Sequence, residues 1–205
     1  AAKAIMTTDR FPKVRSKTLQ NGARIVGFAK GAGMIEPNMA TMLGYILTDA
    51  TIEKSILQTM LSEIADQSFN SISVDGDEST SDTVVLVASN QLPLDDETEF
   101  RQALKEVCTG LASDIVRNGE GTGHVMKVSV QRFPGTDLEA RRLGRHIVNS
   151  PLFKCAVSGN DPNTGRLAGA IGSFMGKFKD AEDVGQMSLT LGGRVIFLNG
   201  KFVLE

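Results

Sequence analysis

The stretch 28-FAKGAGMIEPNMATMLGYILTDA-50 joins two different kinds of sequence. Its first half places Gly31, Gly33 and Pro37 around Lys30, and its second half, residues 42–47, is apolar and uncharged. Three interpretations fit this pattern: a loop that binds phosphate, a turn between two strands, or a place where the chain itself reacts.

The phosphate interpretation is the weakest of the three. The GAG at 31–33 lacks the GxxxxGK[ST] order and the third glycine of GxGxxG. Pro37 and Asn38 stand where a phosphate-binding helix would begin. A turn remains possible, because glycine permits close backbone approach and positive φ between strands expected at 24–28 and 42–47.

Thr41 opens the apolar run and follows the small residue Ala40. A threonine hydroxyl is a weak nucleophile unless a base accepts its proton. His124 and His146 show no recognisable triad context. The remaining base is the α-amino group of Thr41 itself, whose ordinary pKa of about 7.7–8.0 leaves free amine at neutral pH. This chemistry requires cleavage of the Ala40–Thr41 bond, and the hydroxyl can begin it by attacking the preceding carbonyl.

Composition excludes several other classes of protein. The 205 residues carry a net charge of −2 and no long basic run, so no nucleic-acid partner is expected. Nothing approaches the roughly 18 consecutive apolar residues of a membrane span. Cys108 and Cys155 stand in unrelated contexts, and the two histidines lie far apart, so neither a disulfide nor a metal site is predicted. Reduced thiols are typical of cytosolic proteins, and we expect a cytoplasmic location.

Helix and strand patterns mix without a strict βαβ rhythm, so the predicted fold class is α+β. The clearest helix is 95–118, with acidic residues at its start and an apolar stripe. Gly119 is predicted to take a left-handed cap after it. Thr136 and Glu139 form a capping box for another helix, and Asn199-Gly200 predicts a type I′ hairpin turn.

Three further strands are predicted at 71–74, 125–131 and 153–158. The long helix gives way to a new β segment near 121–123. We therefore predict a catalytic α+β region over 1–123, which contains the Ala40/Thr41 site, and a smaller, incomplete α+β region over 124–205.

Five segments together carry a resemblance. They are MTTD at 6–9, KGAGMIEPNMATML at 30–43, DGDESTSDT at 75–83, NGEG at 118–121 and GNDPNTGR at 159–166. In order and spacing they resemble the ornithine acetyltransferases, also called glutamate N-acetyltransferases, which are N-terminal-threonine enzymes of arginine biosynthesis. The resemblance covers essentially all of the chain and corresponds to the middle of the longer family proteins.

The resemblance implies a layered α/β/β/α sandwich with a smaller α+β C-terminal domain. It implies self-cleavage between Ala40 and Thr41 into α and β pieces of one precursor, and a homo-oligomer of the αβ unit. The implied reaction is a ping-pong transfer of acetyl from N-acetylornithine to glutamate through an ester on Thr41. No cofactor or metal is implied, and acetyl-CoA would be a substrate only in a bifunctional member.

The resemblance also assigns residues. Thr41 would be the nucleophile, and substrate would bind to Thr7, Lys30, Thr41 and Glu120. The Lys30 cation suits the α-carboxylate that donor and acceptor share, and the Glu120 carboxylate suits their ammonium groups. Thr8 is adjacent to Thr7, and a slip of one position remains open.

The acidic loop with Asp75, Asp77 and Asp82 is interpreted as local turn bonding rather than as a metal site. Thr122-Gly123-His124 and Thr164 depart from the family pattern, which leaves the substrate open. The alternatives are a related autoprocessed hydrolase or aminopeptidase, a side-pathway acyl-amino-acid transferase, and a non-catalytic scaffold.

Overall fold

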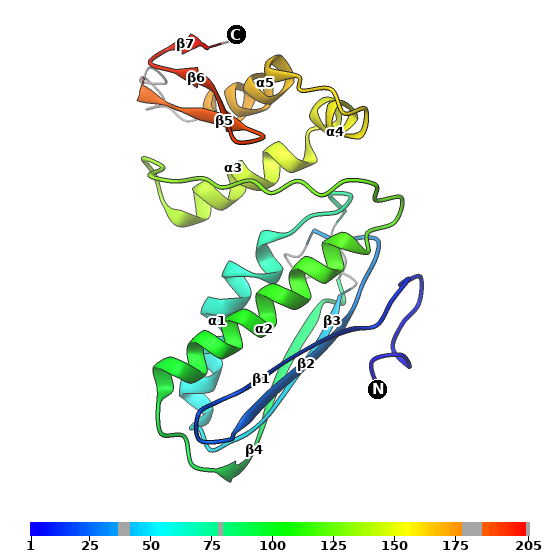
Figure 1. Cartoon of the computed structure of the whole chain (residues 1–205), viewed down its shortest axis with the longest axis vertical. Helices are drawn as coiled ribbons and strands as arrows, with labels where there is room; N and C mark the ends of the chain where they lie inside the picture. Colours follow the sequence, from blue (N-terminus) through cyan, green and yellow to red (C-terminus); the bar gives the residue numbers. More distant parts are fainter. Residues whose placement is uncertain (37–41, 78–79, 178–185, 204–205) are drawn as a thin grey trace. The chain divides into compact units, whose positions relative to one another are not determined.

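The computed structural model describes residues 1–36, 42–77, 80–177 and 186–203 (Figure 1). Its contacts separate two compact units, Ala1–Val125 and Met126–Glu205. Both units contain helices and strands, so the predicted α+β class is confirmed. The boundary predicted after residue 123 lies just before this division. Within the described ranges, no helix is long and apolar enough to cross a membrane.

Unit 1 is built on a four-stranded sheet, in the order β1-β2-β3-β4. The strands are β1 (Lys13–Thr18), β2 (Arg24–Lys30), β3 (Leu43–Ala50) and β4 (Thr83–Leu92). Strand β2 is antiparallel to both β1 and β3, and β4 runs parallel to β3. Lys30 pairs with Leu43, and Leu43 pairs with Thr83. Strand β2 therefore ends where β1, β3 and β4 begin, at what we call the Lys30 end of the sheet.

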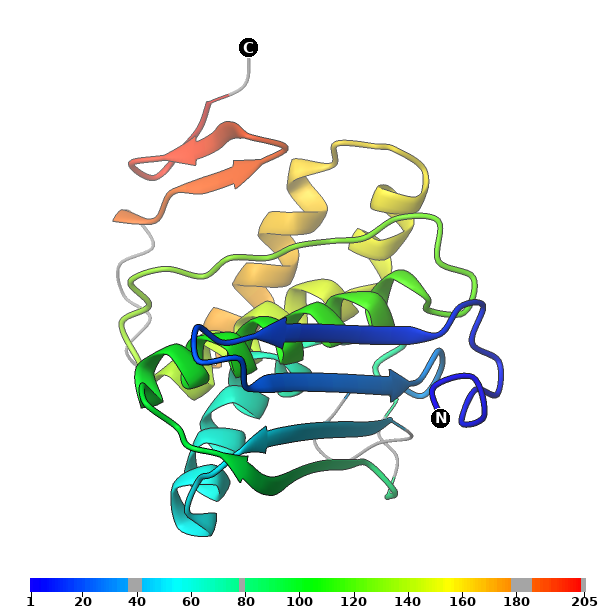
Figure 2. The ribbon, with the colours of Figure 1, turned by 60° about the horizontal axis from the view of Figure 1, so that its bottom comes forward.

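Helices α1 (Lys54–Gln67) and α2 (Glu97–Arg117) cover one face of this sheet (Figure 2). The predicted apolar stripe of α2 is confirmed, because the following residues are all buried: Phe100, Leu104, Val107, Leu111 and Ile115. At Gly27 a Cβ atom would lie 2.8 Å from the side chains of Leu111 and Val107. Glycine at this position lets α2 lie close against β2. The described part of unit 1 thus contains one sheet and one helical layer.

The ends of α2 follow local hydrogen-bonding chemistry. The Asp96 carboxylate caps the start by accepting from the N–H groups of Thr98 and Glu99. The left-handed cap predicted at Gly119 is wrong. Asn118 is the C-cap with φ −96°, and the positive φ of 68° falls on Gly121, because the chain makes one more turn before it reverses.

Unit 2 packs three helices with a three-stranded antiparallel sheet of order β5-β6-β7. Its elements are α3 (Asp137–Asn149), α4 (Pro151–Ser158), α5 (Thr164–Met175), β5 (Leu189–Leu191), β6 (Arg194–Leu198) and β7 (Lys201–Phe202). The capping box of Thr136 and Glu139 is confirmed at the start of α3. Asn199 and Gly200 have φ of 50° and 76°, as the predicted type I′ turn requires.

The three additional strands predicted from sequence are wrong. The short 3₁₀ helix η1 (Phe69–Ser71) overlaps the first, and residues 125–131 form no strand. The third is helix α4, because Ser150 accepts from the Phe153 N–H and Pro151 suits a first helical turn. An apolar or alternating run becomes a strand only where a partner accepts its backbone hydrogen bonds.

Candidate active site

Of the predicted site residues, Thr7, Lys30 and Glu120 are described, and they lie at the Lys30 end of the sheet. Lys30 closes β2 and is buried, with 9 % of its surface exposed. Ala40 and Thr41 lie outside the described residues. Met42, which follows Thr41 directly, is buried with 1 % exposed. The pairing of Lys30 with Leu43 therefore places the polypeptide on the C-terminal side of Thr41 beside Lys30.

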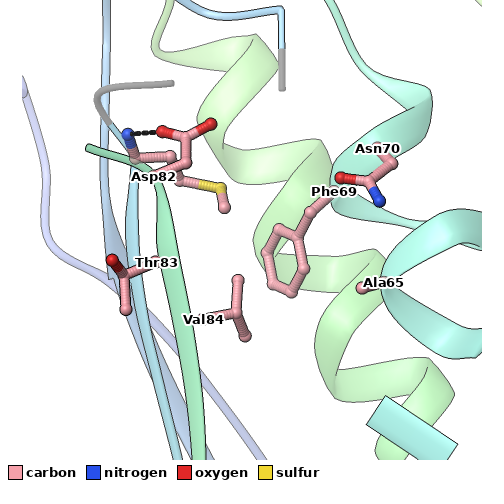
Figure 3. Close-up of a pocket in the computed structure, with 7 residues that line it drawn as sticks. Ala65, Phe69, Asn70, Asp82, Thr83 and Val84 are labelled. Carbon is pink, nitrogen blue, oxygen red and sulfur yellow. Dashed lines mark hydrogen bonds between the residues drawn. The ribbon is translucent and has the colours of Figure 1, made fainter. Parts of the chain in front are cut away.

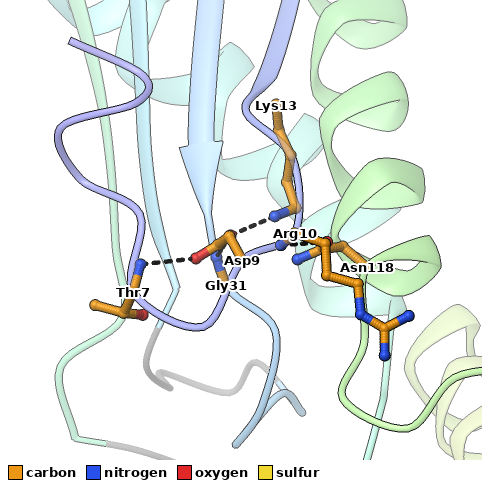
Figure 4. Close-up of polar contacts among 6 residues, drawn as sticks. All are labelled: Thr7, Asp9, Arg10, Lys13, Gly31 and Asn118. Carbon is orange, nitrogen blue, oxygen red and sulfur yellow. Dashed lines mark hydrogen bonds and ion pairs between the residues drawn. The ribbon is translucent and has the colours of Figure 1, made fainter.

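A buried ion pair holds the N-terminal segment at this end (Figure 4). The Asp9 carboxylate and the Lys13 ammonium are in contact, and both side chains are 0 % exposed. Asp9 also accepts from the backbone N–H of Gly31 at 2.9 Å and of Thr7 at 3.2 Å. Burial acts to raise the pKa of Asp9, but the bonds from Gly31, Lys13 and Thr7 outweigh it and lower that pKa. One ionised carboxylate thus links Thr7 to the residue that follows Lys30.

The loop that follows β2 is held by groups far away in the sequence. The Asp75 carboxylate accepts from the backbone N–H of Met34 at 2.7 Å and of Ile35 at 3.0 Å. The Val74 N–H donates to the Ile35 carbonyl at 2.6 Å. These bonds position residues 31–36, the part of the glycine-rich stretch that precedes the 37–41 segment.

Glu120 approaches the same loop from the C-terminal end of α2. Its backbone N–H donates to the Ala32 carbonyl at 2.8 Å. A Cβ atom at Gly33 would lie 3.1 Å from the Glu120 carboxyl carbon, so the carboxylate lies directly over this glycine. Asn118 joins the arrangement through its side-chain oxygen, which accepts from the Arg10 N–H at 2.9 Å. The exposed Glu120 carboxylate and the buried Lys30 thus belong to one neighbourhood of the fold.

Asp82 holds the other side of the 37–41 segment. Its Oδ1 accepts a hydrogen bond from the backbone N–H of Met42. Its Oδ2 is buried and has no hydrogen-bond partner among the described residues. Burial raises the pKa of Asp82 to about 6, although the Met42 N–H and the Lys30 charge partly oppose this. A carboxyl group with a pKa close to neutral is therefore hydrogen-bonded to Met42, the residue next to the predicted nucleophile Thr41.

A small pocket of about 120 Å³ opens beside this carboxyl group (Figure 3). Its lining consists of Met42, Ala65, Phe69, Asn70, Asp82, Thr83 and Val84. Within the described ranges, no group of three His, Cys, Asp or Glu side chains could hold a metal ion. Cys108 is an unsuitable nucleophile, because burial raises the pKa of its thiol to about 12.

Reasoning from the sequence missed the hydrogen bonds that Asp75 and Asp82 accept from residues far away in the chain. Asp75 does make the expected local contact, with the Asp77 N–H at 3.2 Å. Its bonds to Met34 and Ile35, and that of Asp82 to Met42, span about forty residues. The available signal was position: Asp82 directly precedes an apolar run, and Met42 begins another, so a pairing of the two strands would bring them together.

The chain is similar to proteins of one family over nearly its whole length. The family model described as the ArgJ family matches residues 1–204. The arginine biosynthesis bifunctional protein ArgJ of Ruegeria pomeroyi is 44 % identical over 205 residues, which cover 98 % of this chain and 49 % of that protein. The glutamate N-acetyltransferase of Methanopyrus kandleri is 46 % identical over 177 residues, which cover 84 % of this chain and 45 % of that protein. The chain thus spans about half the length of these curated relatives.

A solved structure shows the same fold. The crystal structure of the arginine biosynthesis bifunctional protein ArgJ from Bacillus halodurans matches with a TM-score of 0.63 and 33 % sequence identity. The match covers 78 % of this chain and 76 % of that chain. At this identity the likeness supports a shared arrangement of helices and strands.

Proposed function

Because the chain belongs to the ArgJ family, whose model matches residues 1–204, we propose that it forms part of an acetyltransferase of arginine biosynthesis. The proposed enzyme moves an acetyl group from N-acetylornithine to glutamate. The names of two relatives, an arginine biosynthesis bifunctional protein and a glutamate N-acetyltransferase, support this reaction.

Thr41 is the proposed nucleophile after cleavage of the Ala40–Thr41 bond. Its free α-amine takes the hydroxyl proton while the oxygen attacks the acetyl carbonyl of N-acetylornithine. The amide bond then breaks, and the ornithine amine leaves with that proton. In the second half of the cycle the amine of glutamate attacks the acetyl ester, which releases N-acetylglutamate and restores the hydroxyl.

One observation supports the proposal: backbone hydrogen bonds bring Thr7, Lys30 and Glu120 to the same end of the sheet. Asp9 links the Thr7 N–H to the Gly31 N–H, and the Glu120 N–H is bonded to Ala32. In the proposed complex the Lys30 ammonium binds the substrate α-carboxylate, and the Glu120 carboxylate binds an ammonium group. Thr7 contributes a hydroxyl, which is exposed.

The test begins with the chain termini of the purified protein. N-terminal sequencing should find a polypeptide that begins Thr41-Met42-Leu43. Thr41→Ala should abolish this terminus and acetyl transfer together, whereas Thr59→Ala, which removes an exposed hydroxyl from α1, should change neither. A Thr41→Ala protein that still transfers acetyl would refute the nucleophile.

A hydrolase is distinguished by the dependence on glutamate. A transferase should form N-acetylglutamate in proportion to glutamate, whereas release of acetate at a rate independent of glutamate would favour the hydrolase. The same assay with acetyl-CoA as donor tests for a bifunctional enzyme. The proposal also includes a cytoplasmic location. It further includes a homo-oligomer of paired α and β pieces, and size-exclusion chromatography with light scattering would test this assembly.

A further inference from the structure

Self-cleavage needs a proton acceptor that the later catalytic cycle does not need. In the uncut chain the Thr41 nitrogen is part of the peptide bond to Ala40, and an amide nitrogen does not act as a base. The Thr41 hydroxyl must nevertheless lose a proton when it attacks, and the nitrogen must gain one when it leaves. Some other ionisable group has to serve this first reaction.

Asp82 lies where such a group is needed. Its Oδ1 accepts from the N–H of Met42, and the Met42 nitrogen is bonded to the carbonyl carbon of Thr41. Covalent bonds keep the Thr41 nitrogen and hydroxyl oxygen within about 5 Å of the Met42 nitrogen, whatever the conformation between them. In Figure 3 the second carboxylate oxygen of Asp82 points away from the hydrogen bond that the first oxygen accepts.

Among the described residues, no hydrogen-bond donor accounts for the burial of the second oxygen of Asp82. Buried oxygens almost always have a hydrogen-bond partner. Among the described residues, Asp82 Oδ2 is the one buried side-chain oxygen without one. The carboxylates of Asp75 and Asp9, by contrast, both accept backbone hydrogen bonds. Asp75 accepts from Met34 and Ile35, and Asp9 accepts from Thr7, Gly31 and the Lys13 ammonium.

We propose that Asp82 transfers the protons of the Ala40–Thr41 cleavage, an inference that rests on the proposed function. Oδ2 accepts the Thr41 hydroxyl proton while the hydroxyl oxygen bonds to the Ala40 carbonyl carbon. The bond from that carbon to the Thr41 nitrogen then breaks, and Asp82 returns the proton to the nitrogen. An ester of Ala40 with a free Thr41 amine results, and water hydrolyses the ester to the Ala40 carboxylate and the Thr41 hydroxyl.

The surroundings suit a carboxyl group that exchanges a proton near neutral pH. Among the described residues, the charge of Lys30 acts on Asp82 and favours the ionised form that accepts a proton. The pocket residues from α1 and η1 are uncharged, and the Asn70 amide donates to Asp66 at 2.8 Å. With a pKa of about 6, Asp82 is mostly ionised at pH 7 and still returns the proton readily.

The experiment follows the uncut protein after cell-free synthesis, with dilution into buffers from pH 5 to pH 8 and detection on denaturing gels. Asp82→Asn keeps an oxygen for the Met42 N–H but has no basic oxygen, and it should slow cleavage by at least about 100-fold. Asp75→Asn is the matched control, because Asp75 holds the other side of the segment through two backbone N–H groups. It should leave the pH dependence of cleavage unchanged.

The cleavage rate of wild type should fall as the pH falls through about 6. The cleavage rate of Asp82→Asn should not change in this pH range. Wild-type cleavage that is equally fast at pH 5 and pH 7 would overturn the proposal even if Asp82→Asn does not fold. Asp82→Asn that is cleaved at the wild-type rate would also overturn it, while Thr41 as nucleophile would stand. A wild-type protein that is never cut would instead refute the proposed function.

Discussion

Asp82 accepts a hydrogen bond from the backbone N–H of Met42, the residue that directly follows the proposed nucleophile Thr41. The bond joins the start of β4 to the start of β3, two parallel strands separated in the chain by helix α1. This relationship turns an acidic loop residue into a group of the candidate active site, and its consequences can be measured.

The free energy of unfolding should depend on whether Asp82 is ionised. Burial raises the pKa of this carboxyl from its ordinary value of 3.8 to about 6, so the folded protein keeps a proton that the unfolded chain releases. This stabilisation is complete below about pH 4 and is lost as the pH rises through about 6. We expect wild type to gain stability relative to Asp82→Asn between pH 7 and pH 5. Urea unfolding at both pH values measures the difference, and a difference independent of pH would contradict it.

Loss of the Lys30 charge should shift the pH dependence of cleavage. Lys30 lowers the pKa of Asp82, so Lys30→Met should move the fall in cleavage rate to a higher pH. If Lys30 also binds the α-carboxylate, the same variant should raise KM for both N-acetylornithine and glutamate. Lys54→Met, which alters an exposed lysine at the start of α1, serves as the control. An unchanged pH midpoint would show that Lys30 does not act on this carboxyl group.

Replacing Asp9 alone should destabilise the protein more than replacing both members of the buried pair of Asp9 and Lys13. Asp9→Asn leaves the Lys13 ammonium buried without a charged partner and should lower the free energy of unfolding by about 3–5 kcal/mol. The double variant Asp9→Asn with Lys13→Met removes that stranded charge and should recover much of the loss. Because the pKa of Asp9 is lowered, the effect should be full at pH 7 and fade only in acid. Denaturant titration of wild type, Asp9→Asn and the double variant tests this, and a double variant no more stable than Asp9→Asn would contradict it.

Close packing of α2 on β2 should make Gly27 intolerant of a side chain. Gly27→Ala places a Cβ atom 2.8 Å from the side chains of Leu111 and Val107 and should destabilise by about 1–3 kcal/mol. Gly144→Ala is the matched control, since an added Cβ in α3 meets no atom within 4 Å, and it should stabilise by about 0.5–1 kcal/mol. Thermal unfolding compares both variants with wild type. Equal stability of Gly27→Ala and wild type would show that α2 can shift to accommodate the methyl group.

Local patterns in the sequence predicted the elements that depend on local bonds. The stripe of α2 repeats with the period of a helix, and the Thr136–Glu139 box and the Asn199-Gly200 turn form within four residues. The strands predicted at 71–74, 125–131 and 153–158 failed, because a strand requires a hydrogen-bonding partner elsewhere in the chain. Ser150 and Pro151 are typical of a helix start, and the apolar run after them forms helix α4 rather than the predicted strand.

The sequence alone determined the α+β class, the family resemblance and the candidate residues Thr7, Lys30, Thr41 and Glu120. Tertiary structure decided which backbone groups hold Thr7, Lys30 and Glu120 at one end of the sheet. Asp75 and Asp82 reach N–H groups about forty residues away, and Asp9 is buried against Gly31. Residue spacing does not encode such contacts, because strand pairing creates them. Burial likewise exists only in the folded chain, and it raises the pKa of Asp82 toward neutrality.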